Sequence, residues 1–180
     1  GGRAGNRAAR AAWYCIQVSR IAPLGRVGNQ GQAVWLKLAD QRPCLSLPAD
    51  SADANILLAN LGMTMRALRV RYPYLRIVFV SSRIYGGYAA TDLNPEPFAY
   101  ESGFSVKWLI ESPIQEMRGL PSAPRVGTLD SNTTAVPLAV WGPSMRADGM
   151  TPRPSGLTVL RAAFEWAGML PSPEWEAILR

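Results

Sequence analysis

The sequence predicts an α/β fold with a small parallel sheet between helices, and three observations support this. Three short apolar runs, at residues 32–38, 75–80 and 135–141, have the length and composition of strands. An amphipathic pattern typical of a helix separates the first two runs, and a second helix follows a proline after the second run. Strands that alternate with helices favour parallel pairing through right-handed crossovers.

The length, composition and charge of the chain limit the classes of protein to which it can belong. The chain has 180 residues, of which 48% are hydrophobic and 18% charged, as expected for one folded domain. We expect this domain at 32–180, after a basic lead and loop at 1–31. The net charge of +6 comes from scattered arginines and only two lysines, which favours compositional bias over nucleic-acid binding. The sequence lacks an apolar run long enough to span a membrane, and residues 1–31 lack the apolar core of a signal peptide.

The first crossover is predicted at residues 50–72. Asp50 or Ser51 begins the helix, Asp53 lies in its first turn, where the helix dipole favours negative charge, and Pro73 ends it. Its apolar positions follow the i, i+3, i+4, i+7 rule: Ala54, Leu57, Leu58, Leu61, Met65, Leu68 and Tyr72. The helix therefore joins strand 32–38 to strand 75–80.

The run at 75–80 is continuously apolar, which predicts a central strand covered on both faces. The next helix is expected to begin at Pro97 and to end near Ser112, before Pro113, with Phe104, Trp108 and Leu109 facing inward. Pro137 places strand 135–141 at an edge or a bulge. Residues 13–18 are apolar enough for a further short helix or strand.

Ligands of open α/β sheets bind beyond the carboxyl ends of the strands, which places a candidate site after residue 80. Aromatic, charged and hydroxyl side chains gather there, and rings can stack on sugar faces while carboxylates accept hydroxyl hydrogens. The candidate ligand-binding residues are Ser81, Ser82, Arg83, Tyr85, Gly86, Tyr88, Glu96, Tyr100 and Glu101. The two serines lack a nucleophile motif, so capping of strand ends is the favoured role for their hydroxyls. Glu101 lies near the start of the predicted helix, where the helix dipole favours an acidic side chain, so its presence there does not require a binding role.

The residues that common catalytic and metal sites need are missing. The chain contains no histidine, the usual base that activates a serine near neutral pH. Cys15 and Cys44 do not have a metal-site spacing, and whether they form a disulfide is not decided by the sequence. The spacing of Gly25, Gly28 and Gly31 is not a dinucleotide fingerprint. We therefore expect no metal and no cofactor.

The segment SSRIYGGYA, followed by LNPEPFAYESGFSVKWLIE, resembles a bacterial branch of the SGNH/GDSL-type hydrolases. The similarity extends from about residue 33 to 172 and includes WGP and ADGMTPRPSGLT at 141–158. The resemblance implies a three-layer, flavodoxin-like α/β sandwich and an esterase that acts on acylated carbohydrates or lipids. It also implies a bacterial exported or envelope setting, although the chain carries no export signal.

The catalytic positions depart from that family. Its D-G-T-H-P-S motif corresponds to residues 167–172, where Ala167 takes the place of the acid and Leu170 that of the histidine. Asp40 occupies the place of an asparagine that donates to the oxyanion, and an ionised carboxylate cannot donate; alternatively, Asp40 is only a loop residue. The family's serine motif is absent, so either the first strand is lost or the chain is a fragment.

The sequence therefore predicts an SGNH-hydrolase-like domain without esterase activity that retains binding of a carbohydrate or acylated ligand. The alternative is a fragment of an active esterase, with its serine on a missing N-terminal segment. A decayed product with an unpaired sheet edge is a third hypothesis. The sequence does not indicate the oligomeric state or the identity of the ligand.

Overall fold

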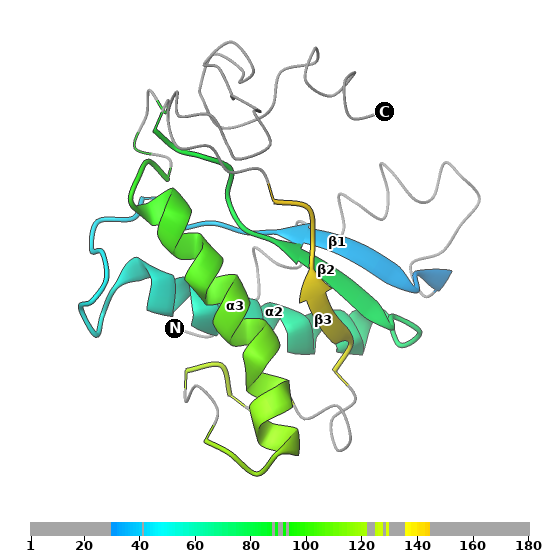
Figure 1. Ribbon diagram of the computed structural model, residues 1–180. Coiled ribbons are helices and arrows are strands. Elements are labelled where there is room, and N and C mark those ends of the chain that lie inside the picture. The colour runs from blue at the N-terminus through cyan, green and yellow to red at the C-terminus, as the bar shows by residue number, and fades with distance from the viewer. Residues whose placement is uncertain are drawn as a thin grey trace, which may run out of the picture.

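The computed structural model describes residues 30–40, 42–87, 89, 92, 94–121, 125–127, 129 and 136–144. Strands and helices alternate along this part of the chain (Figure 1). The elements are β1 (Ala33–Lys37), α2 (Asp53–Arg71), β2 (Ile77–Ser81), α3 (Phe98–Met117) and β3 (Leu138–Trp141). The strands form one parallel sheet in the order β1-β2-β3. This confirms the α/β class and the small parallel sheet.

The register of the sheet decides which side chains share a face. Val78 on β2 pairs with Val34 on β1 and with Ala139 on β3. Phe79, the next residue on β2, pairs with Trp35 and with Val140. Successive side chains on a strand point to opposite faces, so each of these two rows lies on its own side of the sheet.

Helix α2 begins slightly later than the sequence predicted. Its N-cap is Ala52, which has no side chain to cap the first turn. The carboxylate of Asp53 instead accepts hydrogen bonds from the backbone N–H groups of Cys44 and Leu45, at 2.8 and 2.6 Å. The side chain of Asp53 therefore holds the preceding loop against the start of the helix. The helix ends at Arg71, two residues before Pro73.

Helix α3 is longer than expected, so the predicted end before Pro113 is wrong. Pro97 is the N-cap, and the helix continues through Pro113 to Met117. Proline removes the backbone hydrogen bond to the carbonyl of Leu109, which usually breaks a helix. Here the last turn has a tertiary contact, because the backbone N–H of Leu129 donates to Glu116 at 3.2 Å. Such a contact favours continuation of the helix beyond the proline.

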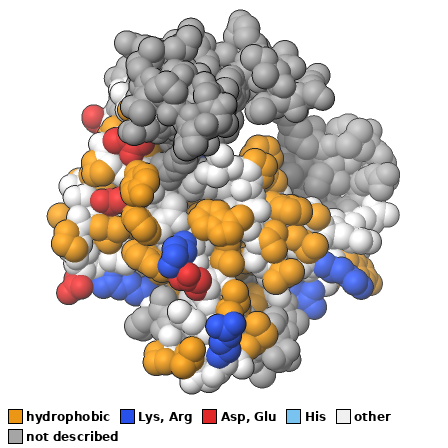
Figure 2. Space-filling model, in the orientation of Figure 1, with side chains coloured by type: hydrophobic (Ala, Val, Ile, Leu, Met, Phe, Trp, Pro, Cys, Tyr) orange, Lys and Arg blue, Asp and Glu red, His pale blue; other side chains and the backbone are white. Residues whose placement is uncertain are grey.

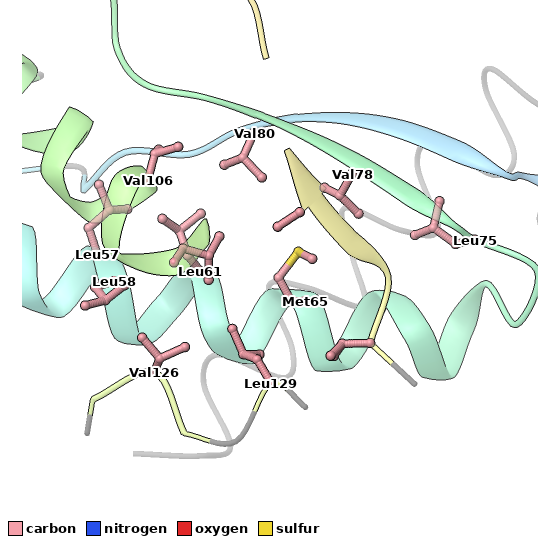
Figure 3. Packing of buried hydrophobic residues seen from close by; sticks show 13 residues of the cluster. Leu57, Leu58, Leu61, Met65, Leu75, Val78, Val80, Val106, Val126 and Leu129 are labelled. Atoms are coloured by element: carbon pink, nitrogen blue, oxygen red, sulfur yellow. The ribbon is translucent and has the colours of Figure 1, made fainter. Parts of the chain in front are cut away.

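The hydrophobic core lies between the two helices and one face of the sheet (Figure 3). Figure 3 shows the side chains of α2 directed toward Val78 and Val80 of β2. The fully enclosed side chains of this cluster include Leu61, Met65, Val78, Val80, Val106, Leu109 and Val126. Both helices lie on this face because two right-handed crossovers in the same direction place their connections on one side of a sheet.

The opposite face of the sheet is more open. Trp35 is 63% exposed, Phe79 is 40% exposed and Leu138 is 59% exposed. The expectation that β2 is covered on both faces is therefore wrong for Phe79. The described residues supply a sheet and one helical layer, and a third layer stays a prediction. The short helix or strand predicted at 13–18 lies outside the described residues, and so does the region where a first strand was expected to be missing.

Helix α3 carries an aromatic row on its outer side. The rings of Tyr100 and Phe104 meet edge to face at 5.6 Å, and those of Phe104 and Trp108 stack at 5.8 Å. Phe104 is exposed and Trp108 is half-buried, so of the three residues expected to face inward only Leu109 is fully enclosed. Figure 2 shows hydrophobic side chains gathered over α3 on this side of the molecule.

Candidate functional site

The candidate site lies at the carboxyl edge of the sheet. Because the strands are parallel, the segments that follow β1, β2 and β3 all leave the sheet at this edge. The N-terminal part of α3 reaches the same place, since the backbone N–H of Arg83, just after β2, donates to Ser102 Oγ of α3 at 3.0 Å. The sequence predicted this location from the order of the elements, and the structure brings most of the candidate residues to it.

The two serines hold strand ends together. Ser81 is 2% exposed, and its Oγ accepts a hydrogen bond from Trp35 Nε1 at 2.8 Å and donates to the carbonyl of Pro143 at 2.5 Å. Ser82 is also buried, and its Oγ lies 3.1 Å from Ser144 Oγ. This agrees with the structural role favoured by the sequence, and neither hydroxyl is an exposed nucleophile.

Glu96 fastens the loop after β2 to the start of α3. Its carboxylate accepts hydrogen bonds from the backbone N–H groups of Gly86 and Tyr100, at 2.8 and 2.9 Å. A Cβ atom on Gly86 would lie 2.8 Å from Ala99 Cβ and 2.9 Å from the carbonyl oxygen of Asn94, so only glycine fits this approach. Glu96 and Gly86 therefore shape the site.

Glu101 does more than complement the helix dipole. It is only 7% exposed, and its Oε1 accepts a hydrogen bond from the backbone N–H of Leu47 at 3.1 Å. Its Oε2 is buried and has no hydrogen-bond partner. Glu96 and Glu101 bind different backbone groups, so they do not form the paired carboxylates of a glycosidase.

Four buried side-chain atoms without a hydrogen-bond partner define the site most sharply. Within the described part of the chain they are Asp40 Oδ2, Arg83 Nε, Asn94 Oδ1 and Glu101 Oε2. All four belong to segments at the carboxyl edge: the loop after β1, the loop after β2 and the start of α3. An unsatisfied buried polar group typically costs about 1–3 kcal/mol, so such groups in a native fold need a partner such as water, an ion or a ligand.

Sequence reasoning missed Asn94, which is 4% exposed and has a φ of 64°. Its Nδ2 donates to the backbone carbonyl of Asp40 at 3.2 Å, which joins the loop after β1 to the approach to α3. The signal in the sequence was an asparagine before a proline, because asparagine tolerates the left-handed backbone better than most residues. Burial of its side chain could not be predicted locally.

Asp40 is half-buried beside α2. Burial raises the pKa of its carboxyl group, as does the nearby charge of Asp53, while a hydrogen bond with Asn60 acts in the opposite direction. Asp40 is therefore not simply an exposed loop residue, because its carboxyl group interacts with residues of α2. Its proposed place at an oxyanion site depends on the family alignment and stays a prediction.

Lys37, at the end of β1, was also missed by the sequence analysis. Burial, and then the charge of Arg83, lower the pKa of Lys37 from 10.5 to about 8. Burial likewise lowers the pKa of Arg83. The charge of Arg83, in the loop after β2, thus acts on Lys37 at the end of β1.

The aromatic candidates have different environments. Tyr85 is half-buried, and Gly87 leaves room for its ring and hydroxyl. Tyr100 is 59% exposed on α3. Tyr88 lies outside the described residues, as do the degenerate family positions Ala167 and Leu170.

Two other features are absent from the described residues. No cluster of three or more cysteine or acidic side chains that could hold a metal is found among them. None of their helices combines the length and the apolar character needed to cross a bilayer. Cys44 is exposed and unpaired within this part of the chain, and Cys15 lies outside it.

Comparison of the chain with protein-family models, with curated proteins and with solved structures gives no match.

Proposed function

We propose that this chain is an SGNH-hydrolase-like domain that binds a carbohydrate or acylated ligand at the carboxyl edge of its sheet without hydrolysing it. The observation that carries the proposal is the set of buried, unpartnered polar atoms on Asp40, Arg83, Asn94 and Glu101. Three of them are oxygens, and at least those of Asn94 and an ionised Glu101 accept hydrogen bonds, while Arg83 Nε donates one. Sugar hydroxyls both donate and accept, so a polyhydroxylated ligand offers both kinds of hydrogen-bond partner. Because the four atoms are buried, the ligand reaches them only when the loops at the carboxyl edge open.

The chemistry of the serines supports the absence of hydrolysis. The chain supplies no histidine, and Lys37 is the one basic residue that pairs in register with Ser81. Lysine serves as the base in some serine enzymes. Ser81, however, directs its proton to the carbonyl of Pro143 and is 2% exposed, so a substrate carbonyl has no access to its oxygen.

The catalytic half of the proposal is tested with a fluorophosphonate, which labels activated serines. Mass spectrometry of the cooperatively folded chain after incubation should show no adduct. An adduct on a single serine would contradict the proposal and identify a base that the described geometry does not contain.

The binding half is tested with Glu101→Gln, which preserves shape but removes the charge. Calorimetric titration with neutral and acidic oligosaccharides should detect binding to the wild type and a loss of about tenfold in the variant, as expected for a hydrogen bond to a charged group. Glu111→Gln is the matched control, because Glu111 lies on the same helix in an exposed ion pair with Lys107. Equal affinities for Glu101→Gln and the wild type would remove Glu101 from the site.

A further inference from the structure

The outer face of α3, opposite the core, carries a stripe of solvent-accessible side chains that mixes apolar and charged types (Figure 2). The members are spaced alternately four and three residues apart, which is the repeat that lets two helices pair along their length. This outer stripe consists of Tyr100, Phe104, Lys107, Glu111, Ile114 and the C-cap residue Arg118. The buried residues of α3, such as Val106 and Leu109, lie on the opposite side of the helix.

The outer stripe is complementary to its own reverse. Residues at equal distances from position 109 form three pairs: Tyr100 with Arg118, Phe104 with Ile114, and Lys107 with Glu111. The first pair joins an aromatic ring to a cation, the second joins two apolar side chains, and the third joins opposite charges. The alternation of four and three also reads the same in both directions. An antiparallel copy of α3 would therefore present a matching side chain at every position.

We infer that a second copy of this chain docks on the outer stripe, with the two α3 helices antiparallel about a two-fold axis at position 109. Two-fold symmetry makes every contact occur twice, as in the interfaces of most homodimers. At the centre, Lys107 and Glu111 form an ion pair at 2.8 Å within one chain, and each gains an opposite charge from the second copy. Tyr100 belongs to the candidate site, so the pairing places Arg118 of the partner subunit beside each site. This inference goes beyond the proposed function and does not rest on it.

Charge fixes both the direction and the register of this pairing. In a parallel pair, Lys107 would face its own copy and Glu111 would do the same, and like charges placed opposite each other are unfavourable. An antiparallel pair shifted by one heptad toward the end of the helix would set Lys107 against Arg118, which also repel each other. Only the antiparallel arrangement centred on position 109 matches all three pairs.

The same residues favour a second copy over other occupants of this face. A further layer of the domain's own core would bury charged groups at its centre, and Lys107 and Glu111 lie at the centre of the stripe. A polysaccharide would stack on rings that share a plane, whereas the rings of Tyr100 and Phe104 meet at 82°.

The size of the stripe predicts a weak dimer. Helix α3 has 20 residues and is therefore about 30 Å long. One helix from each copy gives an interface below about 1,200 Å², which is typical of transient complexes. We therefore expect a reversible dimer with a Kd in the micromolar range.

The first test is sedimentation velocity of the whole chain across the micromolar range, which should show a monomer–dimer equilibrium. Lys107→Glu and Glu111→Lys should each weaken dimerisation at least tenfold, because each makes the central contacts like-charged. Arg76→Glu is the matched control for Lys107→Glu, since Arg76 is exposed at the amino end of β2 and the change in net charge is equal. The net charge of +6 falls in both variants, so overall repulsion alone would strengthen dimerisation rather than weaken it.

Mixing the two charge variants tests the register. Lys107→Glu and Glu111→Lys in equal amounts should form a heterodimer at least as tight as the wild-type dimer, because opposite charges then face each other at every central contact. The double variant should dimerise like the wild type. Phe104→Asp should abolish dimerisation, and Met63→Asp, at an exposed apolar position on α2, should not change it.

Four outcomes would overturn the inference. A chain that stays monomeric across this range would reject it, as would a dimer that Lys107→Glu and Glu111→Lys leave intact. Failure of the mixed variants to pair, while each unfolds cooperatively in urea, would reject the antiparallel register. A monomer whose binding of a neutral oligosaccharide is lost in Phe104→Asp would assign the outer stripe to a saccharide instead.

Discussion

At the residue scale, Lys37 shows how position changes the chemistry of a side chain. A lysine at the end of an apolar run usually extends into water with its pKa unchanged. Here burial and the neighbouring Arg83 lower the pKa to about 8. The folded protein therefore disfavours the charged form of this lysine, and stability must depend on pH.

The sign of that dependence follows from proton counting. Between about pH 8 and 10.5 the unfolded chain retains the proton on Lys37 that the folded chain has lost, so the free energy of unfolding should rise with pH across this window. Urea denaturation at several pH values should show the rise in the wild type. Lys37→Met should lose that contribution, and Lys107→Met, at an exposed position, should keep it. An unchanged rise in Lys37→Met would refute the assignment.

Residues also show why part of the site could not be predicted from the sequence. Ser81 was a candidate because it follows a strand, but its hydroxyl is engaged by Trp35 and Pro143, which depends on the pairing of three strands. Asn94 and Lys37 acquire their importance through burial by distant segments. A local pattern carries no information on such burial, whereas Glu96 and Glu101 were found because acidic residues near a helix start are a local signal.

At the element scale, apolar runs predicted all three described strands, periodicity predicted α2 and a proline predicted the start of α3; the main error was the end of α3. Proline is a strong local stop signal, so the sequence placed the end before Pro113. The structure retains one more turn, with Ser112 Oγ bonded to the carbonyl of Trp108 at 2.8 Å and Glu116 bonded to Leu129. Tertiary contacts outweigh the local preference.

This explanation predicts that Pro113 destabilises α3. Pro113→Ala should restore the hydrogen bond to the carbonyl of Leu109 and raise the free energy of unfolding by about 1–3 kcal/mol, less the entropy that proline removes from the unfolded chain. Urea denaturation measures the change, and hydrogen exchange should show a protected N–H at residue 113. Ile114→Ala, at an exposed position in the same turn, should change stability little. A less stable Pro113→Ala would mean that the ring itself packs favourably.

At the scale of the whole molecule, the strand order explains why one face of the sheet is covered and the other is open. Crossovers that always advance in the same direction place α2 and α3 on one side. The apolar run of β2 suggested burial on both sides because Val78, Phe79 and Val80 are all apolar. Composition alone could not distinguish an apolar side chain in the core from one on an open face of the sheet.

Paired substitutions on the two faces of the sheet test this asymmetry. Leu61→Ala, in the core between α2 and β2, should lower the free energy of unfolding by about 2–5 kcal/mol, because Leu61 is 1% exposed and its removal leaves a cavity. Phe79→Ala should cost less, about 1–2 kcal/mol, since a ring that is 40% exposed loses less buried area than a fully enclosed side chain. Equilibrium urea denaturation of both variants provides the comparison. A cost for Phe79→Ala as large as that for Leu61→Ala would show that a third layer packs on this face in solution, as the family resemblance implies.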